Sequence, residues 1–143
     1  MNDTYLGFDF GMKRIGVALG SRSTADARPL ATVRNGAGGP EWQAVDRLVE
    51  DWTPAALVAG VPYNADGSAH AVTVAAQAFA ATLAERYRLP VHTVDERYSS
   101  LAAADALTAR RQRGDHRRVR SGDLDAAAAA VILTDWLAGE ANR

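Results

Sequence analysis

Apolar and small residues alternate with a period of two near the start of the chain, in the segments 5–10 and 15–20. This is the period of β-strands, whose successive side chains point to opposite faces. The residues between them, 11–14, are typical of a turn. We therefore predict a β-hairpin, followed by a third strand at 30–33 and a loop at 35–40, which is dense in glycine.

The apolar spacing then changes to that of helices. Apolar residues recur at helical intervals in 42–52, and Pro54 ends this predicted helix. A second helical stripe runs from Val72 to Tyr87 and ends before Pro90. These patterns predict two helices that each bury one face.

Two continuous apolar segments predict further strands. The run 55–61 is typical of a strand buried on both faces, and 91–94 predicts a short strand. Ser99 or Ser100 then caps a helix that precedes the last helix. The order predicts one α/β domain over residues 1–143, with a five-stranded mixed sheet (three antiparallel strands, then two parallel) and helices on both faces.

The amino-acid composition excludes several classes of protein. The chain has 143 residues, a mass of 15.2 kDa and no cysteine, which excludes a thiolate nucleophile and a cysteine-based zinc site. The first residues do not resemble a signal peptide, and the longest apolar run, 126–133, is too short to cross a bilayer. We therefore expect a cytoplasmic protein that does not bind membranes.

The net charge of −1 hides an uneven distribution, because the segment 110–120 holds six arginines and one aspartate. Charge runs are often merely solvated. This run, however, leads directly into the helix that carries Asp123 and Asp125. A basic arm beside carboxylates favours contacts with a phosphate backbone, so we predict nucleic-acid binding through Arg117, Arg118 and Arg120.

Acidic residues follow several predicted strands, where ligands gather in open α/β sheets. Such acids either repel one another or bind a hard divalent cation, which can activate water for phosphodiester hydrolysis. Each also has a structural explanation: an Asx turn, a helix N-cap or a surface ion pair. The candidates are Asp9, Asp66, Asp95, Glu96, Asp123 and Asp125.

Asp125 is the hardest of these acids to explain structurally. It shares a helical face with the apolar residues Ala129, Ile132 and Trp136, and an acid on a buried face needs a partner or a metal. Asp123 lies about 200° away around the helix, so the two carboxylates point in different directions. We predict a functional role for Asp125 and an N-cap for Asp123.

Four blocks of this sequence resemble the YqgF (RuvX-like) family of pre-16S rRNA nucleases, also described as Holliday junction resolvases. They occur in the family's order and span nearly the whole chain. The blocks are LGFDFGMKRIGVA at 6–18, GVPYNADGS at 60–68, DERYSS at 95–100, and Asp125 with the alanine-rich run that follows it.

The resemblance implies an RNase H-like fold and hydrolysis of phosphodiester bonds with Mg²⁺ or Mn²⁺. It implies that Asp9, Glu96 and Asp125 are both the catalytic residues and the metal ligands. It also suggests a role in ribosome biogenesis, in processing the 5′ end of the small-subunit rRNA precursor. Asp66 remains an alternative to Glu96, because it follows the strand expected to lie next to the first.

Within the same blocks we expect four further nucleic-acid contacts, from Lys13, Arg14, Asn64 and Arg97. The expected partner is pre-rRNA or branched DNA, bound by a monomer or weak homodimer. A Holliday junction resolvase, a non-catalytic nucleic-acid-binding protein and a phosphate-binding ATPase module remain alternatives. A resolvase would be a stable dimer, the binding protein would not cleave, and the ATPase would need a second copy of the fold.

Overall fold

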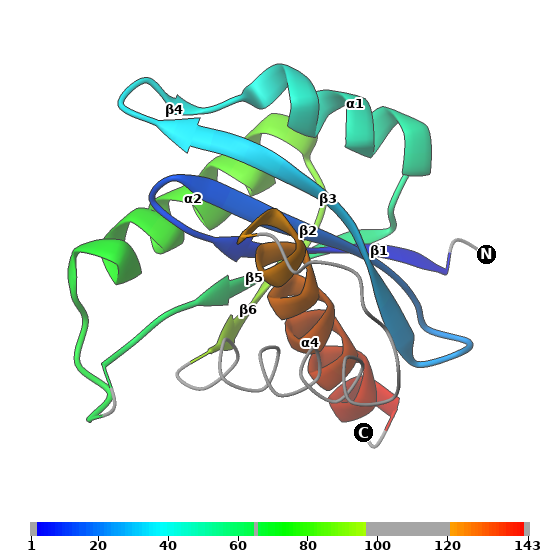
Figure 1. The fold of residues 1–143 in the computed structure, drawn as a ribbon. Helices are drawn as coiled ribbons and strands as arrows, with labels where there is room; N and C mark the ends of the chain where they lie inside the picture. Colours follow the sequence, from blue (N-terminus) through cyan, green and yellow to red (C-terminus); the bar gives the residue numbers. More distant parts are fainter. Residues whose placement is uncertain (1–2, 65, 97–120, 142–143) are drawn as a thin grey trace, which may run out of the picture.

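The computed structural model describes residues 3–64, 66–96 and 121–141. Figure 1 shows a twisted sheet with helices on both faces. The predicted strands and helices in these ranges are confirmed, and the third strand is longer than the predicted 30–33. The helix predicted after Ser99 or Ser100 lies outside the described residues. The elements are β1 (Thr4–Phe10), β2 (Arg14–Ser21), β3 (Asp26–Gly36), β4 (Gly39–Pro40), α1 (Trp42–Trp52), β5 (Ala56–Val61), α2 (Ala71–Tyr87), β6 (Val91–Asp95) and α4 (Ser121–Ala141).

The described strands form one sheet in the order β4-β3-β2-β1-β5-β6. It is antiparallel from β4 to β1 and parallel from β1 to β6. The prediction of five strands was wrong by one, because part of the expected loop pairs with the end of β3. Gly36 lies opposite Gly39, whose φ of +90° suits glycine and allows a tight reversal. A strand of two residues shows no apolar alternation, so the pattern did not reveal it.

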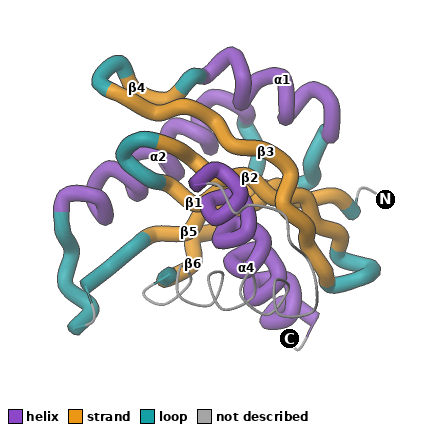
Figure 2. Tube along the Cα trace, viewed as in Figure 1, coloured by secondary structure: helices purple, strands orange, loops and turns teal. Residues whose placement is uncertain are grey.

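Each face of the sheet has its own apolar core. Helices α1 and α2 cover one face, where the Phe8 and Phe79 rings meet edge to face at 5.7 Å. Helix α4 covers the other face, and Figure 2 shows it in front of the strands. The two cores explain why β5, which lies between β1 and β6, is buried along its whole length.

Helix α4 presents small residues to the sheet. The predicted face is confirmed, since Ala129 and Ile132 are fully buried and the partly buried Trp136 packs its ring 5.4 Å from Tyr5. Short side chains let the helix axis approach the strands closely. This close approach is what brings the first turns of α4, and Asp125 with them, to the edge of the sheet where β1 ends. None of the described helices is long and apolar enough to span a membrane.

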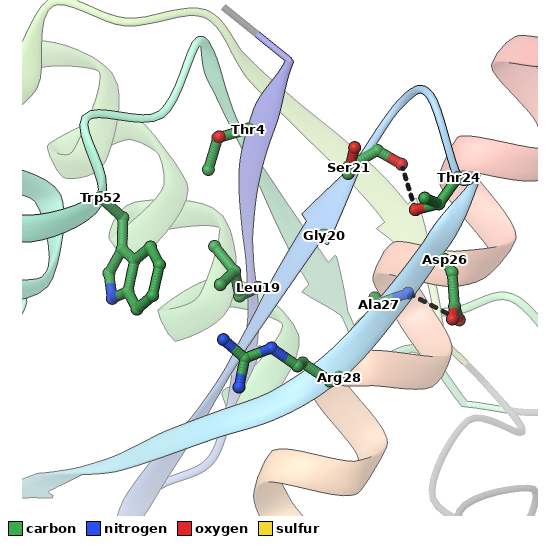
Figure 3. A pocket seen from close by; sticks show the side chains of 9 residues that line it. All are labelled: Thr4, Leu19, Gly20, Ser21, Thr24, Asp26, Ala27, Arg28 and Trp52. Carbon is green, nitrogen blue, oxygen red and sulfur yellow. Dashed lines mark hydrogen bonds between the residues drawn. The ribbon is translucent and has the colours of Figure 1, made fainter.

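A pocket of about 250 Å³ opens at the opposite end of the sheet, where β1 begins. Figure 3 shows Trp52 and Arg28 on its walls, with the guanidinium of Arg28 5.8 Å from the Trp52 ring centroid. Its residues come from the start of β1, the end of β2, the β2–β3 turn, the start of β3 and the end of α1. It lies away from the strand ends that carry the predicted acids.

Candidate active site

The site is centred on Asp9, near the carboxyl end of β1. Its neighbours across the sheet are both glycines: Gly16 on β2 and Gly60 on β5. Directly paired residues in a sheet share a face. The carboxyl group of Asp9 therefore stands on the α4 face between two positions without side chains, which leaves room for groups from other elements.

Glu96 uses the space above Gly60. It follows β6, and its backbone N–H donates to the Val61 carbonyl at 3.2 Å, which extends the β5–β6 pairing by one residue. A Cβ on Gly60 would lie 2.9 Å from Glu96 Oε2 and 2.5 Å from Ile132 Cδ1. A side chain at position 60 would therefore displace the ends of the Glu96 and Ile132 side chains from their present places.

Helix α4 uses the space above Gly16. A Cβ at that position would lie 1.9 Å from the backbone carbonyl oxygen of Asp125, a distance that no real contact allows. The start of α4 therefore rests directly on the β2 backbone. Since Gly16 is paired with Asp9, this contact places Asp125 next to the central carboxylate.

Burial dominates the electrostatics of the pair formed by Asp9 and Glu96. It raises the pKa of both carboxyl groups, and the neighbouring Asp9 carboxyl group raises the pKa of Glu96 further. The negative charge of Asp125 raises the pKa of Asp9 further. Glu96 is 8% exposed, and its Oε2 has no hydrogen-bond partner within the described ranges. A buried carboxylate oxygen without a donor is costly unless a cation or a proton neutralises it.

Asp125 has a different partner. Its Oδ2 accepts a hydrogen bond from Nε of Arg14 at 2.7 Å, and both side chains are partly exposed, at 27% and 43%. Arg14 is the first residue of β2, directly after the hairpin turn. The third acid of the site is thus paired with a cation that the sequence analysis expected to contact nucleic acid.

The residues fit a hard divalent cation. Mg²⁺ is commonly held by one or two carboxylates together with water and substrate phosphates. Asp9 and Glu96 supply two oxygen donors, one of them the unpaired Oε2. In the described part of the chain, no three acidic or histidine side chains enclose a common point. Asp125 is paired with Arg14 instead.

The other predicted residues within the described ranges lie in loops beyond the strand ends. Asp66, the alternative to Glu96, accepts hydrogen bonds from the backbone and hydroxyl of Ser68 in an exposed loop. In that loop Asn64 donates to the Ser68 hydroxyl at 2.9 Å, and Lys13 lies exposed on the hairpin turn. The remaining predicted contacts, Arg97, Arg117, Arg118 and Arg120, lie outside the described residues, as does the side chain of Asp123.

Sequence reasoning did not identify the two glycines as part of the site. Both occur in the motif blocks, but nothing in a linear motif shows that they flank the same aspartate. The relevant signal is the strand register, which pairs residue 9 with residues 16 and 60. A search for glycines across from acidic strand ends would have found them.

The fold is RNase H-like: a mixed sheet whose central strand carries an aspartate, with further acids from the last described strand and the last helix. It is similar to that of Thermus thermophilus RuvC in complex with a Holliday junction, with a TM-score of 0.59, 20% identity, and coverage of 98% of this chain and 96% of that one. The yeast mitochondrial Holliday junction resolvase Ydc2 matches with a TM-score of 0.56, 15% identity, and coverage of 96% and 78%.

Sequence comparison identifies the family. The family described as "RuvX: Holliday junction resolvase" matches residues 3–139. A protein of Legionella pneumophila named "Putative pre-16S rRNA nuclease" is 44% identical over 133 residues, which cover 93% of this chain and 94% of the relative. A protein of the same name from Xanthomonas campestris pv. campestris is 47% identical over 134 residues, with coverage of 94% and 86%. The chain belongs to the RuvX family.

Proposed function

We propose that this protein is a divalent-metal-dependent endonuclease that hydrolyses phosphodiester bonds in structured nucleic acid, and that it processes the 5′ end of the 16S rRNA precursor. The observation that carries this proposal is the facing pair of buried carboxyl groups, Asp9 and Glu96, with an acid from α4 beside them. Burying such a pair does not stabilise the fold, because burial opposes the ionised form of both carboxyl groups and raises their pKa. A site that binds a cation explains it.

Asp9, Glu96 and Asp125 are the proposed metal ligands, and Mg²⁺ or Mn²⁺ the proposed ion. A divalent ion held there supplies the activation of water and the neutralisation of the leaving oxygen. The chain's own contribution is positional. The sheet holds Asp9 in place, Gly60 makes room for Glu96, and the contact at Gly16 brings Asp125 alongside.

Basic and polar groups near the site are proposed to hold the phosphate backbone. Lys13 and Arg14 lie at the β1–β2 turn, next to the carboxylates, and Asn64 lies in the loop after β5. The arginine-rich segment 110–120 precedes α4 in the sequence and adds Arg117, Arg118 and Arg120, while Arg97 directly follows Glu96. A substrate that is RNA of the ribosome places the protein's action in the cytoplasm.

Holliday junction cleavage is the second candidate function. The family description and the fold of the RuvC complex favour it. The names of the relatives at 44% and 47% identity favour rRNA processing, and for that reason we place it first. The two candidates differ in assembly, because a junction with two-fold symmetry calls for a stable dimer. For rRNA processing we propose a monomer or a weak homodimer.

The deciding experiment incubates the pure protein with labelled pre-16S rRNA and with a labelled four-way DNA junction, each in Mg²⁺, Mn²⁺ or EDTA. We expect metal-dependent cleavage near the 5′ end of the RNA and none of the junction. Cleavage of the junction alone would reverse the order of the candidates. No cleavage of either probe in either metal would leave a binding protein and contradict the proposal.

The matched variants are Asp9→Asn and Asp66→Asn, which make the same chemical change in the site and in the exposed loop. We expect Asp9→Asn to lower the cleavage rate by more than about 100-fold, beyond what changes outside the ligand set cost. Asp66→Asn should retain the rate. Circular dichroism should show the same folded spectrum for both. Undiminished metal-dependent cleavage by folded Asp9→Asn would exclude Asp9 as a ligand.

A further inference from the structure

Two arginines face each other beside the carboxylates, at the end of the antiparallel half of the sheet. Arg14 on β2 and Arg34 on β3 are direct cross-strand partners. Val33, next to Arg34, is buried in the core on the α1 and α2 side, so Arg34 itself projects from the α4 face. That is the face that carries Asp9. Both arginines are exposed.

The register places this pair in the row next to the site. Asp9 is aligned with Gly16 on β2, and Gly16 with Thr32 on β3. Arg14 and Arg34 come two residues further toward the end of the sheet on the same strands. The strand of Arg34 is two spacings from that of Asp9, or about 10 Å. From that position the long Arg34 side chain can reach a phosphate of a bound nucleic acid, close to the phosphate that lies at the carboxylates.

Like charges directly opposite each other on neighbouring strands destabilise a sheet. In this sheet, the repulsion between Arg14 and Arg34 is only partly neutralised by acidic partners. Arg14 is paired with Asp125 at 2.7 Å, whereas Arg34 makes no ion pair with any residue in the described ranges. An exposed and uncompensated arginine opposite a second arginine suits an anionic ligand, and guanidinium groups bind phosphate oxygens in bidentate fashion.

We propose that Arg14 and Arg34 together form a phosphate-binding site for the nucleic-acid backbone, and that Arg14 enters it only when a divalent cation takes its place at Asp125. The inference rests on the proposed function. Without metal, Arg14 neutralises Asp125 and Arg34 alone attracts phosphate. With metal, the carboxylate no longer needs the guanidinium, which turns to the substrate. Metal and nucleic acid therefore bind cooperatively, through a single exchanged ion pair.

The test measures binding of the full-length protein to a labelled RNA hairpin and a labelled four-way DNA junction by fluorescence anisotropy. Titrations across several salt concentrations are run in EDTA and in Ca²⁺, with gels to check that the probe stays intact. The variants are Arg34→Gln, Arg34→Lys, Arg14→Gln and the matched control Arg28→Gln. Arg28 is an exposed arginine of the same strand, at its other end beside the distant pocket.

Arg34→Gln should lower the log–log salt slope by about 0.7 to 0.9, the value of one phosphate contact, in both EDTA and Ca²⁺. Arg34→Lys should keep the slope, because the charge remains, and Arg28→Gln should leave it unchanged. Arg14→Gln should lower the slope by a similar amount in Ca²⁺ but not in EDTA. By calorimetry without nucleic acid, Arg14→Gln should also bind metal about threefold or more tightly, since a competing positive charge is gone.

An unchanged slope for Arg34→Gln, or an equal fall for Arg28→Gln, would overturn the phosphate site. An equal loss for Arg14→Gln in EDTA and in Ca²⁺, or weaker metal binding, would overturn the exchange. If either result is obtained while the wild type still binds the probes, it contradicts this inference and does not contradict the proposed nuclease function. If the wild type binds neither probe, both the proposed function and this inference fail.

Discussion

At the scale of single residues, the site combines groups that a stable fold would avoid. Glu96 is buried with an oxygen that has no partner in the described ranges, and it faces Asp9. Burial opposes the ionised form of both acids and raises their pKa. In the metal-free protein, the buried pair therefore tends to keep bound protons. Binding a cation removes this cost. We therefore expect the two carboxyl groups to connect metal binding, protonation and stability.

This connection predicts that Glu96→Gln stabilises the metal-free protein. Glutamine carries no charge, and its amide can donate to Asp9, so we expect a gain of about 1 to 2 kcal/mol at neutral pH. Mg²⁺ should raise the melting temperature of the wild type and not of the variant. Thermal unfolding in EDTA and in Mg²⁺ measures both. The exposed Glu85→Gln makes the same change outside the site and should leave both values unaltered.

The pH dependence of stability follows from the same shifts. The pKa of Glu96 is raised from its usual value of 4.5, so above about pH 4.5 the folded protein holds protons that the unfolded chain has lost. Stability in EDTA must then fall as pH rises from about 5 toward 8. In the Glu96→Gln variant this fall should be smaller. A flat profile for the wild type in denaturant titrations at several pH values would contradict the burial argument.

Asp125 and Asp123 provide a second comparison between neighbouring residues. Asp125 faces the sheet and influences the pKa of Asp9, so Asp125→Asn should lower the cleavage rate by at least about 100-fold, as loss of a ligand does. The predicted N-cap role of Asp123 was wrong, because α4 begins at Ser121 and Asp123 is its third residue. Asp123→Asn should still change the rate little, because Asp123 is not a proposed ligand. Rates at saturating substrate measure both effects. If Asp123→Asn abolishes cleavage and Asp125→Asn does not, the register assigned to the helix is wrong.

At the scale of elements, the decisive contact is that of α4 with the β2 backbone. No side chain separates them at Gly16, because a Cβ there would overlap the Asp125 carbonyl oxygen. A helix is held at this distance only where the strand presents glycine. The position of Asp125, one of the proposed catalytic acids, is thus set by a residue on another element that has no side chain.

We therefore predict that Gly16→Ala moves the start of α4 and destabilises the protein by about 2 kcal/mol or more, as overpacking does. Cleavage should fall more than stability alone explains, because Asp125 moves with the helix. Gly139→Ala is the matched control. A Cβ on Gly139 meets nothing within 4 Å, and alanine stabilises a helix by up to about 1 kcal/mol relative to glycine. Denaturant unfolding and cleavage rates, measured for both variants, separate the two effects.

At the scale of the whole molecule, charge is divided between an acidic centre and basic groups that precede or flank it. The carboxylates alone would repel a polyanion until a cation binds. The segment 110–120, with a net charge of about +5, directly precedes α4 in the sequence. The proposed function therefore assigns substrate attraction and catalysis to different parts of the chain.

We predict that replacing Arg117, Arg118 and Arg120 with alanine lowers the salt slope of binding by up to about 2 to 3, if each contacts one phosphate. Turnover at saturating substrate and the melting temperature should stay close to the wild-type values, because these residues are neither proposed ligands nor apolar core residues. Titrations of both proteins across several salt concentrations provide the test. An unchanged slope together with lost stability would instead assign these arginines to structural ion pairs.

Local chemistry was enough to predict most of the elements from sequence. The apolar periodicities of the described strands and helices, and the prolines that end α1 and α2, depend on neighbouring residues only. Asp9 and Asp125 were identified because one ends a strand and the other interrupts an apolar helix face. The short strand β4 was missed, since two residues cannot display a period.

What only the tertiary structure decided is which residues from distant elements meet. Which of Asp66 and Glu96 lies beside Asp9 depends on the tertiary structure, in which Glu96 takes that place in the space above Gly60. The pairing of Arg14 with Asp125 joins residues 111 positions apart. Periodicity reports the environment of each residue along its own element, whereas register and helix docking set distances between elements. A single sequence contains the first directly, and the second only through the packing of the entire chain.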